Sequence, residues 1–361
     1  MVCEDNPKIT DQDTRSRRPG MKEYSDTSHI LYYLYCILRD YTDEEEGHYL
    51  SQLQIQRILR DKYDIDPDRK TIKKQLENLV DLNDSENSGI EIRQIPGLHG
   101  GYQMLSRPFE VSEVKLLVDM VQSSHSITQK QTKKLIGKLL TLASKKQSEE
   151  IFEQSSHLYC PKSDDKDVFY NIDEILTAIS QNKRIRFRYY HWNEKKRLVM
   201  TKNKKSGYTA DPFAMVYNDG FYYMMSYSAE TEEHIKTYRV DKIQKVEILD
   251  DEIEEQPLPK DYLKNLKKRS FGMFTGHDRT VTLSCDKSKA GIIIDRFGKD
   301  VPIFLTPDSL EKINATVTVT VSRQFYGWLF GAGIKVAEPE DVKNDYVEYL
   351  RETLEENEKR N

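Results

Sequence analysis

Cysteine pairs, long apolar runs and a secretory signal are all missing from this 361-residue sequence. Its four cysteines lie far apart and form no CxxC pair, which argues against a structural zinc site and against a disulfide framework. No apolar run reaches the roughly 18 residues that a membrane span needs. The first residues also lack the apolar stretch of a signal peptide. We therefore expect a cytoplasmic protein with no membrane partner.

Catalytic motifs are equally scarce. The eight histidines form no HxH or HExxH pattern, and the sequence has no Walker A lysine loop. The triplet Gly331-Ala332-Gly333 lacks the rest of a dinucleotide fingerprint, and no cysteine has an evident histidine partner. Carboxylate pairs occur only within charge runs, which are usually solvated. The sequence thus predicts neither an enzyme nor a cofactor nor a metal site.

An excess of positive charge is missing as well. The chain has 55 basic and 60 acidic residues, a net charge of −5. A nucleic-acid function would therefore have to depend on local basic patches. With 37% hydrophobic residues the chain can still build modest cores, and its length suggests two to three domains at about 150 residues each.

Three amphipathic helices and a hairpin are predicted near the N-terminus. Apolar residues recur at helical spacing in three segments, residues 28–41, 51–61 and 67–82. Asp66 is the expected N-cap of the third helix, because Pro67 suits the first helical position. A glycine-rich turn between alternating apolar residues follows, which indicates a two-stranded hairpin. This order is typical of a winged helix-turn-helix, placed at residues 21–107 after a disordered tail at residues 1–20.

The rest of the chain completes an α+β multidomain prediction. Residues 108–167 read as a connector with two helices, and residues 168–250 as a helix followed by five short strands of a small curved barrel. An acidic, proline-containing linker is expected at residues 251–278. Residues 279–361 alternate strand and helix as βαβαβα, which favours a small α/β sandwich.

The third predicted helix concentrates positive charge at its N-terminal end. In a helix-turn-helix, this end meets base edges and phosphates in the major groove. The expected DNA contacts from this helix and the hairpin are Arg69, Lys70, Thr71, Lys73, Lys74, Arg93 and His99. A solvated helix face and a plain β-turn are the competing interpretations. The acidic run at residues 43–46 would have to point away from the DNA.

A second basic region spans residues 183–205, with ten lysines and arginines against the single acid Glu194. Aromatic residues interleave with these charges, a combination typical of sites for single-stranded nucleic acid or nucleotides. Strand alternation places Arg186, Arg188 and Tyr190 on one face and apolar residues on the other. A basic, exposed sheet edge that discourages aggregation is the alternative interpretation.

Four segments, in this order, resemble the WYL-domain transcriptional regulators of bacteria. PDRKTIKKQLENL resembles their recognition helix, and DPFAMVYNDGFYYMMSYSAETEEHIKTYRVDKIQKVEI resembles the segment that defines the WYL domain. The Trp-Tyr-Leu triplet of the family falls on Tyr222-Tyr223-Met224, so two of its three residues are replaced. DRFGKD and FYGWLFGAGIKVAEPEDV resemble the extension that often follows this domain.

The resemblance covers about residues 25–355 and implies an Sm/SH3-like barrel, a cytoplasmic homodimer and ligand-responsive control of transcription. Together with the basic region, it predicts ligand contacts from Arg186, Arg188, Tyr190, Tyr208, Tyr222, Tyr223 and Arg239. Structural roles stay open for several of them. Arg239 could instead pair with Asp241 or Asp211, Tyr208 could be a packing aromatic, and alternation lets at most one of the adjacent pair Tyr222 and Tyr223 face a ligand.

Two classes of function follow from these features. In the first, a homodimer binds operator DNA through its winged helix, and a nucleotide, oligonucleotide or single-stranded DNA binds the WYL domain. The C-terminal region would then support dimerisation or close the ligand site. The alternative is an accessory single-stranded nucleic-acid-binding protein that works with a defence or RNA-guided system. The 16 acidic and 11 basic residues over 21–107 keep that alternative open.

Overall fold

The computed structural model describes most of the chain: residues 27–84, 89, 91–97, 100–157, 159–201, 207–228, 235–253, 262–273, 277–306 and 309–359. The predicted tail at residues 1–20 and the hairpin residue His99 lie outside these ranges. The chain divides into two compact units. Unit 1 comprises Met1–Asp119 and Ile136–His157, and unit 2 comprises Met120–Leu135 and Leu158–Asn361.

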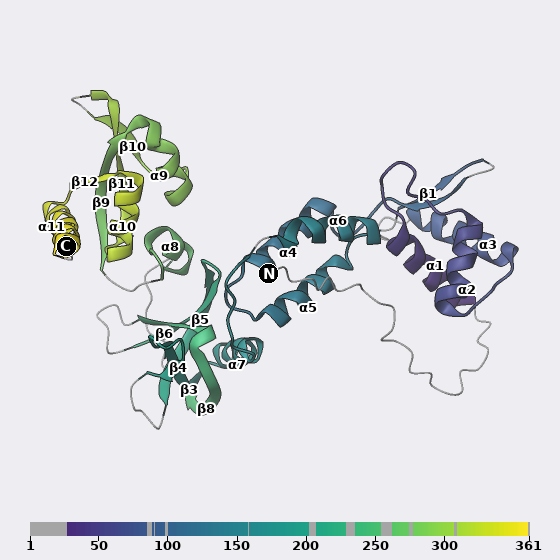
Figure 1. The fold of residues 1–361 in the computed structure, drawn as a ribbon, viewed down its shortest axis with the longest axis horizontal. Helices are drawn as coiled ribbons and strands as arrows, with labels where there is room; N and C mark the ends of the chain where they lie inside the picture. Colours follow the sequence, from purple (N-terminus) through teal and green to yellow (C-terminus); the bar gives the residue numbers. More distant parts are fainter. Residues whose placement is uncertain are drawn as a thin grey trace. The chain divides into compact units, whose positions relative to one another are not determined.

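Unit 1 begins with three helices and a two-stranded hairpin, in the predicted order (Figure 1). Their bounds are α1 (Thr27–Tyr41), α2 (Gln52–Tyr63), α3 (Arg69–Asp81), β1 (Ile92–Ile95) and β2 (Gly101–Met104). The strands pair antiparallel, and Leu50 adds an isolated bridge to Tyr102. Apolar side chains from all these elements form one buried core that includes Ile37, Leu76 and Ile92. These elements are confirmed, while their role in DNA binding stays a prediction.

The start of the third helix differs from the prediction. Asp68, not Asp66, is the N-cap of α3, and its carboxylate accepts hydrogen bonds from two backbone N–H groups of the first turn at 2.9 and 3.0 Å. The hydroxyl of Thr71 also donates to it, and these bonds lower the pKa of Asp68. Asp66 instead accepts a hydrogen bond from the Arg60 guanidinium at 2.9 Å. The Asp-Pro-Asp sequence offers two capping carboxylates, and only the second lies at the helix end.

The connector contains three helices within its described residues rather than the predicted two. Their bounds are α4 (Val111–Ser123), α5 (Gln129–Leu140) and α6 (Lys145–Ser156). The separation of α5 from α6 follows from a capping box, in which Ser144 and Gln147 each accept a hydrogen bond from the other's backbone N–H. This local start signal divides an apolar pattern that reads as one continuous helix.

Unit 2 contains a helix and a six-stranded curved sheet within the described residues. Their bounds are α7 (Val168–Ser180), β3 (Lys183–Trp192), β4 (Leu198–Met200), β5 (Tyr208–Asn218), β6 (Phe221–Tyr227), β7 (Ile235–Arg239) and β8 (Ile243–Glu252). The sheet order is β4-β3-β5-β6-β7, and β8 also pairs with β3. The strands that the structure describes show no pairing between β7 and β8, so this sheet is a half-barrel. The short strand β4 is an addition to the five predicted strands.

The predicted turn at Asn218-Asp219-Gly220 joins β5 to β6. Asp219 and Gly220 both have positive φ angles, 47° and 82°, as tight turns between antiparallel strands require. The Gly220 carbonyl accepts hydrogen bonds from the backbone N–H groups of His125 and Ser126 at 2.9 and 3.1 Å. A Cβ added at Gly220 would lie 2.5 Å from the His125 ring. Glycine therefore allows this turn to dock on the segment that follows α4.

The C-terminal part of unit 2 forms a second, antiparallel sheet with helices. Its elements are β9 (Asp278–Asp286), α9 (Ala290–Phe297), β10 (Ile303–Thr306), β11 (Ser309–Thr320), α10 (Arg323–Ala332), β12 (Lys335–Glu338) and α11 (Glu340–Glu358). The sheet order is β10-β11-β9-β12, so β10 is an extra strand in the predicted alternation. The predicted linker contains a helix, α8 (Tyr262–Arg269), whose Leu266 is buried against Met225 and Ile235.

In the part of the chain that the structure describes, no helix is both long enough and apolar enough to cross a membrane.

The N-terminal core makes its own stability prediction. Leu76 of α3 is fully buried, so Leu76→Ala should lower the free energy of unfolding by about 2–5 kcal/mol through lost burial and a residual cavity. Leu53→Ala, at a 56% exposed position on α2, is the control and should cost less than about 0.5 kcal/mol. Urea unfolding of both variants measures the difference. Equal midpoints would contradict the placement of α3 in this core.

Candidate functional site

The N-terminal end of α3 presents its positive charges to solvent. Four cationic side chains are exposed there, Arg69, Lys70, Lys73 and Lys74. The opposite side of the helix is buried through Ile72, Leu76 and Leu79, as the spacing predicts. Lys73 lies 3.7 Å from Glu77, and the other three cations have no carboxylate partner within the described ranges. The Thr71 hydroxyl is used inside the helix cap, so its free hydrogen-bonding capacity is reduced.

The hairpin contributes less than the sequence suggests. Arg93 on β1 is exposed and lacks an ion-pair partner among the residues that the structure describes. His99 belongs to the undescribed tip of the same hairpin. Among the described residues of the hairpin, Arg93 is therefore the cation available for a phosphate contact.

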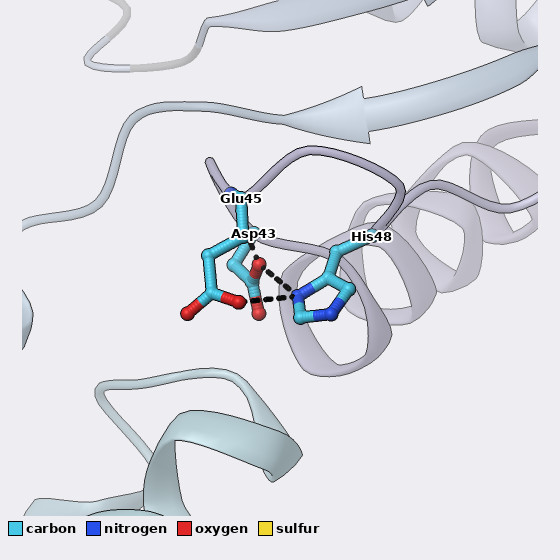
Figure 2. Close-up of side chains that lie close together, drawn as sticks. All are labelled: Asp43, Glu45 and His48. Carbon is cyan, nitrogen blue, oxygen red and sulfur yellow. Dashed lines mark hydrogen bonds and ion pairs between the residues drawn. The ribbon is translucent and has the colours of Figure 1, made fainter.

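The acidic run between α1 and α2 contacts helix α6 rather than α3. Asp43 is 2% exposed, and its carboxylate accepts hydrogen bonds from the Ser144 hydroxyl at 2.7 Å and pairs with His48 Nδ1 at 2.6 Å (Figure 2). Glu45 forms an ion pair with Lys146 at 2.8 Å. These acids are thus engaged with the first turn of α6.

The same three side chains, Asp43, Glu45 and His48, are the only described group that could offer three ligand atoms to a metal ion. Their donor atoms are already engaged, since both ring nitrogens of His48 have partners and the Lys146 ammonium lies 2.9 Å from its Nε2. This ammonium supplies positive charge where a metal ion would supply it. The polar atoms of this cluster therefore have partners without a metal ion, and the cluster holds the α1–α2 loop against α6.

Strand β3 separates a core face from a polar face, as its alternation predicts. Ile185 and Phe187 are buried in the half-barrel, and Tyr189 packs against the same core. Arg186 on the other face is exposed, while Arg188 and Tyr190 are half-buried, as is typical of a polar sheet face.

Charge compensation decreases along this polar face. Arg184 forms two hydrogen bonds with Asp211 at 2.5 and 2.9 Å. Arg186 lies 3.2 Å from Glu247 of β8, in an exposed pair. Arg188, two residues further, has no ion-pair or hydrogen-bond partner for its guanidinium in the described part of the chain. The available positive charge therefore lies toward the C-terminal half of β3.

Aromatic residues follow the uncompensated arginine. By strand alternation, Tyr190 and Trp192 share the face of Arg188. Trp192 is 44% exposed, and the Lys242 ammonium lies 4.7 Å from its ring centroid. Burial lowers the pKa of Lys242. Trp192 and Lys242 lie beside this face, and neither is among the ligand contacts predicted from the sequence. The sequence signal for Trp192 is its position: it lies an even number of residues from Arg186 and Arg188, so strand alternation puts it on their face.

Arg239, at the end of β7, has its guanidinium engaged by a carboxylate and an aromatic ring. Its guanidinium donates two hydrogen bonds to the buried Asp241 at 3.0 and 2.9 Å and lies 3.5 Å from the centroid of the Phe221 ring. The backbone N–H of Arg239 also donates to the Tyr189 hydroxyl of β3 at 3.2 Å, whereas the guanidinium is paired with Asp241. The first of the two structural alternatives for Arg239 is therefore observed.

A series of contacts nevertheless links Arg239 to the aromatic end of β3. Asp241 lies in the 3₁₀ helix η2 (Val240–Lys242), and Lys242 of the same turn lies 3.8 Å from its carboxylate. Lys242 in turn stacks on Trp192. Lys242 and Asp241 thus connect Trp192 to Arg239.

Three of the four predicted tyrosines, Tyr208, Tyr222 and Tyr223, take part in packing. Tyr208 stacks on Phe187 with centroids 5.9 Å apart and donates its hydroxyl to the Thr201 carbonyl at 3.1 Å. Tyr222 packs against the half-barrel core. Tyr223 packs on the other side of β6 against a cluster that includes Leu266, and burial raises its pKa. Helix α8 in the predicted linker explains why both faces of β6 are covered.

The structure also brings together a cysteine and a histidine that are 35 positions apart. Cys160 Sγ lies 3.4 Å from His125 Nδ1 and within hydrogen-bonding distance of the Ser123 carbonyl at 3.2 Å. His125 Nδ1 also lies 2.8 Å from the Pro161 carbonyl, so this nitrogen carries the proton and donates it there. A protonated Nδ1 cannot accept the thiol proton, and the other ring nitrogen, Nε2, lies 3.8 Å from Sγ.

Comparisons with known proteins identify one domain. Residues 170–248, from α7 into β8, match the family model of the WYL domain. A search of solved structures found the proteasome accessory factor B/C (PafBC) of Arthrobacter aurescens, at 14% sequence identity and a TM-score of 0.27. That match covers 94% of this chain and 50% of the other, so this chain spans about half the length of that protein. A search of curated proteins found no match.

Because Arg239 has an ion-pair partner and Arg188 has none in the described part of the chain, replacing each with alanine should affect stability differently. Arg239→Ala should lower the free energy of unfolding by about 3 kcal/mol, because it leaves the Asp241 carboxylate, whose side chain is 4% exposed, without its partner. Arg188→Ala should change it by less than about 0.5 kcal/mol. Chemical denaturation of both variants measures this. If the two variants are equally stable, the structural role of Arg239 is wrong.

Proposed function

We propose that this WYL-domain protein is a transcription regulator that binds operator DNA as a homodimer and responds to a nucleic-acid ligand. The observation that carries the proposal is the exposed, mostly uncompensated cationic end of α3 in a chain that also contains a WYL domain. A cationic helix end after a short turn is the geometry that enters a major groove, and binding to two half-sites one helical turn apart explains the dimer.

Duplex binding depends on the local distribution of charge around α3. Arg69 and Lys70 lie at the first turn, with Lys73 and Lys74 one turn later, so the four can follow a phosphate backbone. Arg93 on the hairpin would add a phosphate contact beside the groove, and His99 belongs to the same hairpin. Asp43 and Glu45 of the α1–α2 loop are engaged with α6, which removes their direct competition for these cations.

We propose that the ligand binds at the C-terminal half of β3. Arg188 supplies a guanidinium for a phosphate, and the rings of Tyr190 and Trp192 supply stacking surfaces for bases. Arg186 can join if a phosphate displaces the exposed Glu247 carboxylate. Arg239 acts indirectly, by holding η2 and therefore Lys242 against Trp192. A ligand shifts the regulator only through a different affinity for its two states.

A second candidate is an accessory protein that binds single strands and uses its winged helix for protein contacts. The stacking face of β3 favours it, because that chemistry suits single strands whether or not the chain binds an operator. Fluorescence anisotropy with labelled single strands and with duplexes of its own promoter distinguishes the two. Tighter binding to every single strand than to any duplex would favour this alternative.

The recognition helix is tested by charge reversal. Lys73→Glu combined with Lys74→Glu should weaken promoter binding more than about tenfold and reduce the slope of log K against log salt by about 2, because two phosphate contacts are lost. Fluorescence anisotropy at several salt concentrations measures both quantities.

The matched control is Lys133→Glu combined with Lys134→Glu, two exposed lysines on α5 that make the same change in net charge. The control should bind DNA nearly as well as the unmodified protein. Equal losses in both double variants would mean that bulk charge, not α3, determines affinity.

The ligand site is tested by removing its uncompensated arginine. Arg188→Ala should weaken binding of a single-stranded oligonucleotide of about ten residues at least fivefold, while the free protein keeps its promoter affinity. Base stacking on Trp192 should also quench its fluorescence, which is measured in a Trp328→Phe background because the chain has two tryptophans. Arg351→Ala on α11 is the charge-matched control. Unchanged oligonucleotide binding by Arg188→Ala would exclude this face.

A further inference from the structure

An open, surface-facing cavity of about 340 Å³ lies in the C-terminal part of unit 2, between α8, the segment from α9 to β10, and β11. Its lining residues are Asn265, Lys268, Arg269, Phe297, Asp300, Val301, Thr316, Val317 and Thr318. This volume falls within the range of small-molecule sites, which is roughly 300–1,000 Å³. None of these residues belongs to the polar face of β3, so the cavity is separate from the proposed ligand site.

The charge on one wall of this cavity is strongly biased. Helix α8 carries four cations and no acid in eight residues, and Lys268 and Arg269 line the cavity. Arg269 forms an ion pair with Asp278, and its buried Nε has no hydrogen-bond partner in the described chain. Lys268 has no carboxylate partner in the same described set. Asp300 is the one acid of the lining, and it is exposed at the surface.

The remaining walls combine hydroxyl groups with an apolar base. Thr316 and Thr318 occupy alternate positions of β11 and therefore point to the same face of the sheet. Phe297 contributes a buried aromatic ring. Gly298 has a φ of 94°, and a Cβ there would lie 3.3 Å from the Lys268 ammonium, so the glycine leaves room for this group. Cations, hydroxyl donors and an apolar wall suit a small molecule with an anionic group and a ring.

We propose that this cavity binds a small phosphorylated molecule of nucleotide size. Lys268 supplies the charge for the phosphate, and Arg269 and the two threonines supply hydrogen-bond donors. The half-buried Val301, beside the Phe297 ring, contacts the apolar part of the ligand. The proposal does not depend on DNA binding or on the β3 site.

Helix α8 would transmit occupancy of this cavity to the WYL domain. While Lys268 and Arg269 line the cavity, Leu266 of the same helix is buried against Met225 of β6 and Ile235 of β7. The segment after α8 is attached to β7 as well, because the Thr237 hydroxyl donates to a backbone carbonyl in it at 3.0 Å. A ligand that stabilises one position of α8 therefore acts directly on the β6–β7 side of the half-barrel.

The test is isothermal titration calorimetry of the full chain with adenosine monophosphate, inorganic phosphate and adenosine. We expect adenosine monophosphate to bind more tightly than either of the other two. Lys268→Ala should weaken its binding at least fivefold. Lys264→Ala, which removes the same charge from α8 outside the cavity lining, should leave it within about twofold.

A second pair of variants separates the two sites. Arg188→Ala should not change binding of adenosine monophosphate, and Lys268→Ala should not change binding of single-stranded oligonucleotides. Thr318→Val, at an exposed position of the lining, gives a further test without a change in charge and should weaken binding at least twofold. The proposal is overturned if none of the phosphorylated probes binds, or if Lys264→Ala and Lys268→Ala weaken binding equally.

Discussion

Ion pairing decides which of the many cations of this acidic chain are available for a ligand. Arg184, Arg186 and Arg239 have carboxylates within hydrogen-bonding distance, whereas Arg188 and three of the four cations at the start of α3 have none in the described chain. The net charge does not reveal this difference, because it counts cations that are paired with carboxylates and cations that face solvent alike. The functional surfaces are therefore defined by the carboxylates as much as by the lysines and arginines.

Buried and exposed pairs differ in what they can do. The Asp241 carboxylate is almost fully buried, so its bond to Arg239 is costly to break and positions η2. The Arg186–Glu247 pair is exposed on both sides and contributes little to stability, so a phosphate can replace the carboxylate at small cost. The Arg186 side chain of β3 can thus exchange its partner for a ligand, while the Arg239–Asp241 pair keeps η2, which lies beside Trp192, in place.

Sequence patterns were sufficient for the elements whose signals are local. The three N-terminal helices, the alternation of β3 and the turn before β6 all follow from periodicity and turn residues. Tertiary contacts decided the rest. Helix α8 lies in a segment that reads as an acidic linker, and only its packing against Met225 shows why Tyr223 is covered. The partners of Arg239 and the proximity of Cys160 to His125 depend on distances that no spacing in the sequence reveals.

The turn at Gly220 restricts how this chain can vary. Its backbone conformation disfavours every residue with a side chain, and the nearby His125 ring leaves no volume for even one methyl group. The neighbouring strands tolerate many apolar substitutions because their side chains can repack. Position 220 cannot adapt in this way, because both its positive φ angle and the nearby His125 ring exclude a side chain. Saturation mutagenesis of this hairpin would accordingly recover glycine alone at position 220.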